Sequence, residues 1–519
     1  MEGTIYSIIP ALITLLLVLL TRKVLLSLGT GIVIGALFVN DFQVGASIKE
    51  IWTVFYTIFY EDGTVNIDNF YLLTFLILLG IMSAFLQAIG GSRAFGEWMI
   101  KRVKTRVGAQ VMTAFIGVVI FIDDYFNSLA VGQIARPLTD RQKISRAKLA
   151  YYIDSTSAPV TVLSPISSWG AYIIGILGSL FATYQITDMK PIEAFLKIIP
   201  YNFYAILALL LVFIVAIFKF DIGPMRKHED LAVKTGNLLG GSNKKVTGDL
   251  TNSLDAHPNG KISFLFIPII VLIVVTISMM LFTGAKNAQS EGISGIFNTI
   301  ANMDVNISLF VGGILAVLSV IFYYIRLNKP KESFAHIVIE GTKTMLPAIY
   351  ILILAWMIGS IIGTLKTGEY LAHLVTEWNV EYAFIPFILF IICGVMSLAT
   401  GTSWGTFGIM LPIAIEIALV TDYSLLIPSL AAVLSGSVFG DHCTPISDTT
   451  ILSSTGAGAN HIDHVMTQLP YAFLAAIASG IGFLIVGFTH QLLLGLFISI
   501  AILAVVPFIY SLLQKKKLA

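Results

Sequence analysis

The sequence has little charge and almost no cysteine. Of its 519 residues 12% are charged, the net charge is +1, and only two cysteines occur, Cys393 and Cys443. So weak a charge excludes nucleic acid or another strongly charged macromolecule as a partner. Two cysteines in apolar surroundings exclude a disulfide framework and a thiolate metal cluster. The first apolar run also lacks the basic residues and the cleavage site of a signal peptide, so we expect it to remain as a helix.

Long apolar runs are what the chain has instead. Hydrophobic residues make up 56% of it, and one membrane helix needs about 20 apolar residues. The chain is therefore predicted to be an all-α polytopic membrane protein. Runs of this kind lie near residues 5–21, 24–40, 70–90, 161–183, 200–219, 262–283, 306–325, 344–364, 424–440, 470–489 and 491–512. A polar stretch over 220–261 is predicted to be a solvated cytoplasmic linker between two halves.

The distribution of charge predicts sidedness, because lysine and arginine collect on the cytoplasmic side of a membrane. Residues 92–106 and residues 136–148 each carry five basic residues and one acidic residue, and Lys515, Lys516 and Lys517 stand near the C-terminus. Residues 41–69 carry five acids and one base, and residues 365–381 carry three acids and one base. We therefore expect the N-terminus outside and the C-terminus in the cytoplasm.

The segment from Val107 to Ala135 lies between two basic loops and is too short for two crossings. It is predicted to be a re-entrant hairpin with "DDYFNS" (123–128) at its tip. A second hairpin, Tyr382 to Val420, is predicted to enter from the opposite face, with "ATGTSWGT" in its middle. The chain is then two inverted repeats, over 1–219 and 262–489, each with a hairpin and a broken helix. An extra span and basic tail follow over 490–519, which gives about 11 full spans plus two hairpins.

Polar clusters interrupt the apolar pattern at places that this repeat makes equivalent. Pro159 and Pro445 are predicted to break their helices and to free backbone carbonyls. Carbonyls, hydroxyls and carboxylates together suit a hard cation such as Na⁺, and a buried aspartate can hold either Na⁺ or H⁺. The candidate ion- or substrate-binding residues are Asp124, Asn127, Ser128, Asp154, Ser155, Thr156, Thr400, Thr402, Ser403, Asp441, His442, Thr444, Ser447, Asp448 and Thr449.

These candidates are divided between two expected Na⁺ sites, and no other metal is expected. One site is expected at Asp154, Ser155, Thr156 and Asn127 with freed carbonyls. The other is expected at Asp441, Thr444, Ser447 and Asp448 with oxygens of the hairpin from Thr400 to Ser403. Protons would compete for one or more of the aspartates.

Some polar residues also fit purely structural roles. Ser164, Ser453 and Ser454 taken singly fit hydrogen bonds to their own helices, and Asp123 fits a helix cap. His442 fits a proton carrier or a hydrogen-bonded packing residue.

The neighbouring residues indicate the roles of two histidines and two tryptophans. His461 and His464 have a spacing that suggests a metal site, but they stand in a stretch of Gly, Asn and Asp, so we expect solvated loop histidines. Trp169 and Trp404 are expected to be packing anchors rather than substrate platforms.

Three stretches carry a resemblance to a known family. They are "FIDDYFNSLAVGQIARPLTDRQKISRAKLAYYIDSTSAPVTVLSPISSWGAYI", "GTSWGTFGIMLPIAIE" and "GDHCTPISDTTILSS". Together they resemble the NhaC family of Na⁺/H⁺ antiporters, within the ion transporter superfamily, over about Gly108 to Ile174 and Cys393 to Tyr471. The resemblance implies two inverted repeats and a substrate-holding unit that moves against a scaffold. It also implies location in the plasma membrane, no cofactor besides Na⁺ and H⁺ as transported or coupling ions, and a superfamily in which homodimers are common.

The resemblance leaves the transported substrate open, because members of this family include Na⁺/H⁺ exchangers, malate/lactate exchangers and carriers of amino acids such as methionine. Because no arginine or lysine lies inside the polar clusters at 123–128, 154–165, 400–406 and 440–450, a cation is favoured, and we expect Na⁺/H⁺ antiport. The alternative is Na⁺- or H⁺-coupled transport of a small organic solute. An enzyme is not expected, because aspartyl intramembrane proteases require Gly-x-Gly-Asp, whereas this chain reads Val438-Phe439-Gly440-Asp441.

Overall fold

A computed structural model gives the architecture. It describes residues 1–21, 23–61, 63–91, 93–95, 98, 103–121, 124–165, 167–241, 254–287, 299, 303–327, 330–367, 370 and 381–518. In this part of the chain the secondary structure is helical apart from one two-stranded hairpin. Seven of the described helices are long and apolar enough to cross a membrane. The predicted class, an all-helical multi-pass membrane protein, is confirmed.

The first half contains more structure than its apolar runs alone predict. Its elements are η1 (Ile5–Ile8), α1 (Ile9–Thr21), α2 (Val24–Val39), α3 (Val44–Thr57), β1 (Tyr60–Glu61), β2 (Thr64–Val65), α4 (Ile67–Ala88), α6 (Arg106–Val119), α7 (Asp124–Arg141), α8 (Arg146–Leu163), α9 (Ser168–Thr183), α10 (Pro191–Ile198), η2 (Ile199–Tyr201) and α11 (Phe203–Phe218). The acidic stretch over 41–69 therefore holds a helix and an antiparallel hairpin rather than only a loop.

The second half begins after a linker that is itself partly helical. Its elements are α13 (Ser263–Asn287), α15 (Val305–Ile325), α16 (Phe334–Thr364), η3 (Tyr382–Phe384), α18 (Ile385–Thr400), α19 (Ser403–Val420), η4 (Tyr423–Leu425), α20 (Leu426–Cys443), α21 (Asp448–Ala457), α22 (His461–Thr489) and α23 (Leu492–Leu518). Within the linker, α12 (Gly223–Thr235) buries Met225, Glu229 and Ala232. The expectation of a wholly solvated linker is wrong over this helix.

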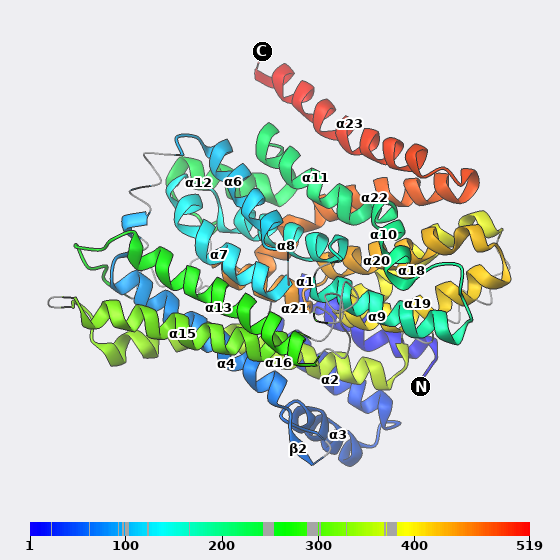
Figure 1. Ribbon diagram of the computed structural model, residues 1–519, viewed down its shortest axis with the longest axis horizontal. Helices are drawn as coiled ribbons and strands as arrows, with labels where there is room; N and C mark the ends of the chain where they lie inside the picture. Colours follow the sequence, from blue (N-terminus) through cyan, green and yellow to red (C-terminus); the bar gives the residue numbers. More distant parts are fainter. Residues whose placement is uncertain are drawn as a thin grey trace.

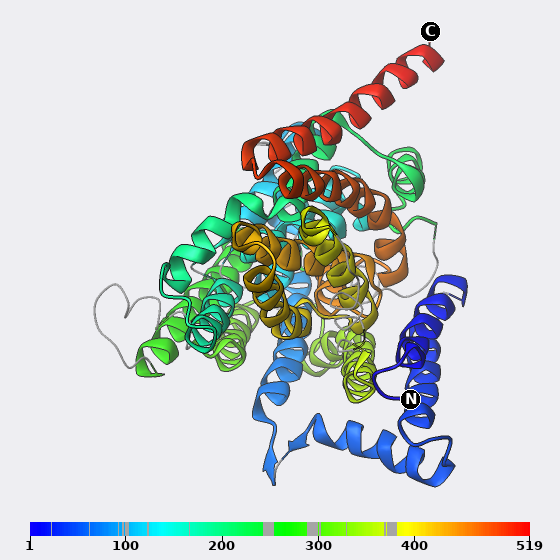
Figure 2. The ribbon, with the colours of Figure 1, turned by 90° about the vertical axis from the view of Figure 1, so that its right-hand side faces the viewer.

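The helices pack as two groups that lie side by side (Figure 1). We call α1, α2, α4, α13, α15 and α16 the outer bundle; they pack on one another around two apolar cores. We call α6 to α9, α11 and α18 to α22 the central bundle. The largest apolar core takes residues from all of these helices except α7 and α21. The C-terminal α23 packs on α22 and α11 at the edge of the central bundle (Figure 2). Leu129 of α7 and Leu452 of α21 join the core of the outer bundle, so these two helices connect the groups.

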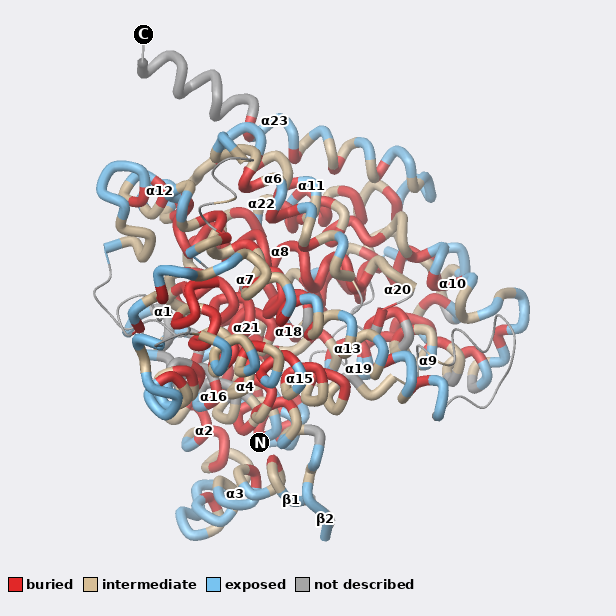
Figure 3. The backbone as a smooth tube through the Cα atoms, turned by 60° about the vertical axis from the view of Figure 1, so that its left-hand side comes forward, coloured by how far each residue is buried: buried red, intermediate tan, exposed pale blue. Residues whose placement is uncertain are grey.

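Helix α8 lies at the centre of the molecule (Figure 3). Every residue from Arg146 to Val162 is buried, although this helix carries an aspartate and several hydroxyls. A helix that is buried all round must satisfy its polar side chains within the protein. The polar residues of α8 are therefore expected to contact other polar side chains.

Two helix pairs match the predicted hairpins. Helices α6 and α7 contact each other across a short connection, and so do α18 and α19, which turn at Gly401 with φ of 77°. The segment from Tyr382 to Thr400 is by itself long and apolar enough to cross a membrane. The re-entrant course of these hairpins therefore stays a prediction.

Two helices are interrupted by the same four-residue pattern, Ser164-Pro165-Ile166-Ser167 and Thr444-Pro445-Ile446-Ser447. At each break the residue before the proline is extended, as proline requires, and the final serine caps the next helix by accepting a hydrogen bond from its backbone. Pro445 is confirmed as a helix break. Pro159 is not one, because α8 continues through it to Leu163. Thr161 follows Pro159 at the same spacing, but its hydroxyl donates to the Ser157 and Ala158 carbonyls of α8 instead of capping a new helix.

Candidate functional site

The break between α20 and α21 places two aspartates close together. Asp441 lies in the last turn of α20, and Asp448 is the first residue of α21. The Thr449 hydroxyl donates to Oδ2 of Asp441 at 3.0 Å, and the Thr449 backbone N–H donates to Oδ1 of Asp448 at 2.8 Å. Oδ1 of Asp441 is buried and has no hydrogen-bond partner among the described residues. One carboxylate oxygen is thus left without a donor.

Hydroxyls and carbonyls surround these carboxylates. The Ser447 and Thr449 hydroxyls lie 2.8 Å apart, and Ser447 is fully buried. The backbone N–H of Thr444 bonds the carbonyl of Asp441 at 3.3 Å, and the Thr444 side chain is buried at the bend. The break therefore gathers oxygen atoms around a point of negative charge.

The turn of the second hairpin lies directly against this break. A Cβ atom on Gly401 would lie 2.9 Å from the carbonyl oxygen of Ile446, so only glycine allows this approach. Ser403 is buried and donates to the Ser437 carbonyl on α20 at 3.2 Å. Thr400 and Thr402 form the turn itself, where the Thr400 hydroxyl lies 3.5 Å from the Thr402 carbonyl. The structure thus brings the turn that carries these three predicted residues against Ile446 of the break and Ser437 of α20.

The first hairpin also points toward α21, which belongs to the other half of the chain. The Tyr125 hydroxyl donates to Oδ2 of Asp448, and the Ser128 and Ser453 hydroxyls lie 3.1 Å apart. Asp124 is buried as the first residue of α7. Asn127 donates from Nδ2 to the carbonyls of Gly117 and Ile120 at 2.6 and 2.5 Å, which closes the end of α6. Asp123 lies outside the described residues.

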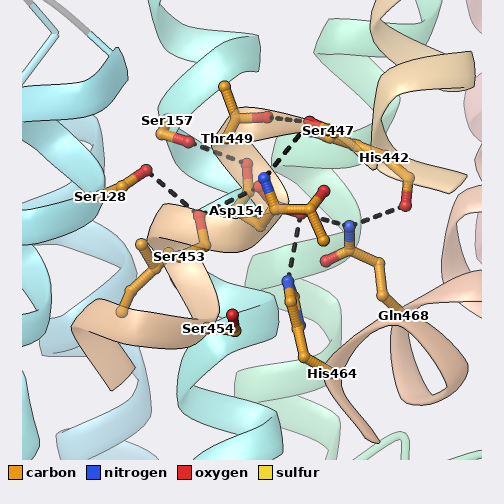
Figure 4. A network of polar contacts seen from close by, with 12 residues as sticks. Ser128, Asp154, Ser157, His442, Ser447, Thr449, Ser453, Ser454, His464 and Gln468 are labelled. Atoms are coloured by element: carbon orange, nitrogen blue, oxygen red, sulfur yellow. Dashed lines mark hydrogen bonds and ion pairs between the residues drawn. The ribbon is translucent and has the colours of Figure 1, made fainter. Parts of the chain in front are cut away.

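Asp154, at the centre of α8, is saturated with donors (Figure 4). Its Oδ1 accepts from the Ser453 hydroxyl at 3.0 Å. Its Oδ2 accepts from the Thr450 hydroxyl at 3.3 Å and from Nε2 of Gln468 at 2.5 Å, and it lies 3.3 Å from Nε2 of His464. The carboxylate therefore joins α8 to α21 and α22 rather than facing open space.

Four of these partners were missed as site residues, namely Thr450, Ser453, His464 and Gln468. His464 and Gln468 are fully or almost fully buried on α22, so the assignment of His464 to a solvated loop is wrong. His461 is also no loop residue, because it begins α22 and contacts Ser454 and the Pro445 carbonyl through its two ring nitrogens. The available signal was the four-residue spacing of His464 and Gln468, which places both on one face of a helix.

The remaining predicted residues have more local roles. The Thr156 hydroxyl donates to the Tyr152 carbonyl of its own helix at 2.7 Å, and Ser155 is buried on α8. Nδ1 of His442 lies 3.0 Å from the Tyr204 hydroxyl, while its carbonyl accepts from Gln468 at 3.0 Å. Thr156 lies against Gly117, whose carbonyl accepts from Asn127, so these two residues of the first expected Na⁺ site are near each other. That site stays a prediction.

The structure also shows the contacts of the two tryptophans and of Ser453 and Ser454. The rings of Trp169 and Trp404 pack edge to face with centroids 5.7 Å apart, and Trp169 is fully buried. The Ser454 hydroxyl donates to the Ile451 carbonyl of its own helix, whereas Ser453 bonds Asp154 and Ser128. Ser453 is thus part of the polar network and Ser454 mainly bonds its own helix.

This arrangement of broken helices and buried carboxylates is that of an ion-coupled membrane transporter, and comparison with known proteins identifies the family. The model of the Na⁺/H⁺ antiporter family matches residues 160–488. The chain belongs to this family of transporters and is not an enzyme.

Relatives of known sequence or structure are similar to the chain over different lengths. An uncharacterized protein of Haemophilus influenzae is 47% identical over 497 residues, which cover 95% of this chain and 93% of the relative. The malate-2H⁺/Na⁺-lactate antiporter of Bacillus subtilis is 32% identical over 198 residues, which cover 37% of this chain and 40% of that protein. The solved structure of MtrF from Neisseria gonorrhoeae, reported with a class of antimetabolite efflux pumps, covers 87% of this chain and 86% of its own. It has a TM-score of 0.35 and 14% identity.

Proposed function

We propose that the protein exchanges Na⁺ for H⁺ across the plasma membrane and that the cation binds at the break between α20 and α21. The observation that carries this proposal is the pair of carboxylates at the break. Asp441 is buried, with one oxygen lacking a donor, and Asp448 follows across the break. In the described part of the chain neither aspartate forms an ion pair with a lysine or arginine. Buried carboxylates without a fixed cationic partner need a mobile cation or a proton.

The ligands in this proposal are oxygen atoms. Asp441 and Asp448 supply charge, and the Ser447 and Thr449 hydroxyls with the freed carbonyls around Thr444 supply neutral oxygens. Hard cations prefer such donors, and transporters use unwound helix segments in this way. Asp154 is not included among the Na⁺ ligands, because its oxygens already accept from Ser453, Thr450 and Gln468.

The two interrupted helices support an inverted repeat as the framework of exchange. Both halves carry a helix pair followed by a helix broken at Ser/Thr-Pro-Ile-Ser. In this proposal the hairpins enter from opposite faces, the N-terminus lies outside and the basic C-terminus lies in the cytoplasm. The central bundle moves against the outer bundle, and Na⁺ and H⁺ bind alternately to the same group of aspartates.

A coupled organic solute is the second candidate function. It is favoured by the similarity to the B. subtilis protein, whose name describes exchange of malate and lactate together with H⁺ and Na⁺. Oε1 of Gln468 and Nε2 of His442 are buried beside the site without hydrogen-bond partners among the described residues. Such atoms suit a polar organic molecule as well as water.

One experiment separates the two candidates. The protein is reconstituted in liposomes, an inward Na⁺ gradient is imposed, and internal pH is followed with and without malate, lactate or amino acids. Proton efflux driven by Na⁺ alone supports antiport. A pH that stays constant until an organic solute is added supports the second candidate and contradicts the first.

Asp441→Asn tests the cation site itself. We expect this change to abolish Na⁺-driven proton efflux in a protein that still elutes as a single species, because the negative charge that would bind the cation or the proton is lost. Asp422→Asn is the matched control. Hydrogen bonds from Ser424 hold the pKa of partly exposed Asp422 below its usual range, so this variant also removes a real negative charge. Near-normal transport by Asp441→Asn would remove that residue from the site.

A further inference from the structure

Among the residues that the structure describes, His464 is the buried histidine that lies against a buried carboxylate. We infer that His464 carries the exchanged proton and that Asp154 holds its ring in position, an inference that rests on the proposed Na⁺/H⁺ antiport. The proton and Na⁺ then bind to different side chains. Na⁺ binds at Asp441 and Asp448, and H⁺ binds at His464 on α22, which Asp154 connects to α21.

The geometry gives the imidazole one occupied and one open nitrogen. Nε2 lies 3.3 Å from Oδ2 of Asp154, and both side chains are fully buried. Nδ1 has no hydrogen-bond partner among the described residues. A neutral ring that donates from Nε2 to Asp154 presents a lone pair at Nδ1. A proton added there makes an imidazolium that is paired with a carboxylate, and its release restores the neutral ring.

The other nearby titratable groups do not offer this combination. Those on helices that pack around His464 include Tyr151 and Tyr152 on α8, Tyr204 on α11, Asp441, His442 and Cys443 on α20, Asp448 on α21, and His461, Asp463 and Tyr471 on α22 itself. His442 bonds a tyrosine hydroxyl rather than a carboxylate, and both ring nitrogens of His461 have partners. Lys148, Glu229 and Asp221 form separate ion pairs near the linker.

Asp154 provides the link between the proton and the cation. Two of its donors, Thr450 and Ser453, belong to α21, the short helix whose first residues are Asp448 and Thr449. The Thr450 hydroxyl also lies 3.4 Å from the carbonyl of Asp441. When His464 becomes charged, Asp154 is drawn toward it and its bonds to α21 weaken. The position of α21, and with it the cation site, then depends on the proton.

The test uses the full chain in liposomes and two assays. The first follows Na⁺-driven proton flux over a series of pH values. The second follows exchange of radioactive Na⁺ for unlabelled Na⁺ without a pH gradient, which needs no proton. We expect His464→Gln to lower the proton flux by about a hundredfold or more, the effect of removing a positioned acid–base group. Exchange of Na⁺ for Na⁺ should persist.

A matched variant and a second change complete the test. His461→Gln removes another ring from the same helix and should keep the wild-type pH dependence. Proton flux by His464→Gln with the wild-type pH dependence would overturn the inference. If His464→Gln is not monodisperse, Asp154→Asn is measured in its place. Loss of the carboxylate charge beside the ring should move the pH dependence of the proton flux to lower pH. An unchanged pH dependence overturns the inference. Absence of Na⁺-driven pH change in the wild-type protein would instead contradict the proposed function.

Discussion

At the scale of single residues, donors rather than residue type distinguish two of the central aspartates. Asp154 accepts from Ser453, Thr450 and Gln468, whereas Asp441 accepts from Thr449 on one oxygen only. A buried carboxylate surrounded by donors keeps its charge and fixes its neighbours, while one that lacks donors gains from a bound cation. Asp154 is therefore suited to join helices, and Asp441 is suited to bind and release an ion.

Ser453→Ala tests whether Asp154 joins the helices. The change removes the only donor to Oδ1 among the described residues and leaves that oxygen buried. We expect the free energy of unfolding to fall by about 1 to 3 kcal/mol, the range for a buried polar atom that loses its hydrogen-bond partner. Thermal or denaturant unfolding in detergent measures it.

Ser479→Ala is the control for this change. Ser479 is also fully buried in a helix, but its hydroxyl bonds only the Ala475 carbonyl of its own helix. Its loss should have a smaller effect, since such local bonds contribute little to a helix. Equal effects of the two substitutions would contradict the special role of Ser453.

At the scale of elements, α21 depends on close contact with α7. A Cβ atom on Gly132 would lie 2.5 Å from the backbone of Gly456, and one on Gly456 would lie 2.4 Å from the Ser128 carbonyl. Small residues allow two membrane helices to approach so closely. This approach brings Ser128 to Ser453 and Tyr125 to Asp448.

Gly132→Ala should therefore separate α7 from α21. The added methyl group meets backbone, which cannot rotate away, so we expect a loss of about 1 to 3 kcal/mol in unfolding free energy, together with reduced transport. Gly175→Ala is the control, because a Cβ on that exposed helical glycine meets nothing within 4 Å. The unfolding free energy and the Na⁺-driven proton flux are measured for both variants. A Gly132→Ala protein as stable and active as Gly175→Ala would show that the close approach is unimportant.

Sequence patterns could predict the helix pairs and the break at Pro445, because apolar length and proline act locally. They misplaced the first break, since Asp154 and Asp441 were treated as equivalent. The shared Ser/Thr-Pro-Ile-Ser was the better guide, because the capping serine decides where a helix can restart.

The composition around His461 looked like a loop because Asn460 is a helix cap, which accepts from the Asp463 backbone. The partners of Asp154 come from distant helices, and no local pattern reports such contacts.

At the scale of the whole molecule, the linker between the halves contacts both of them. Glu229 of α12 accepts from the Ser145 backbone at 2.8 Å and pairs with Arg106 and Lys148 at 2.7 and 3.3 Å, all in the first half. The Tyr471 hydroxyl on α22 donates to the Phe220 carbonyl and accepts from the Ile222 backbone, which adds the second half. The linker therefore holds α8 and α22, the helices that carry Asp154 and His464.

Glu229→Gln tests this connection. The change leaves buried Lys148 with Asp221 and removes its second negative partner. Breaking a buried charge pair costs about 3 to 5 kcal/mol, and because Asp221 remains we expect about 3 kcal/mol. The control is Asp230→Asn on the same helix, whose exposed pair with Arg226 at 3.9 Å is worth about 1 kcal/mol or less. Thermal unfolding of both variants in detergent measures the difference. Equal shifts would mean that α12 merely covers the surface, whereas a large shift for Glu229→Gln alone would show that the linker stabilises the two halves together.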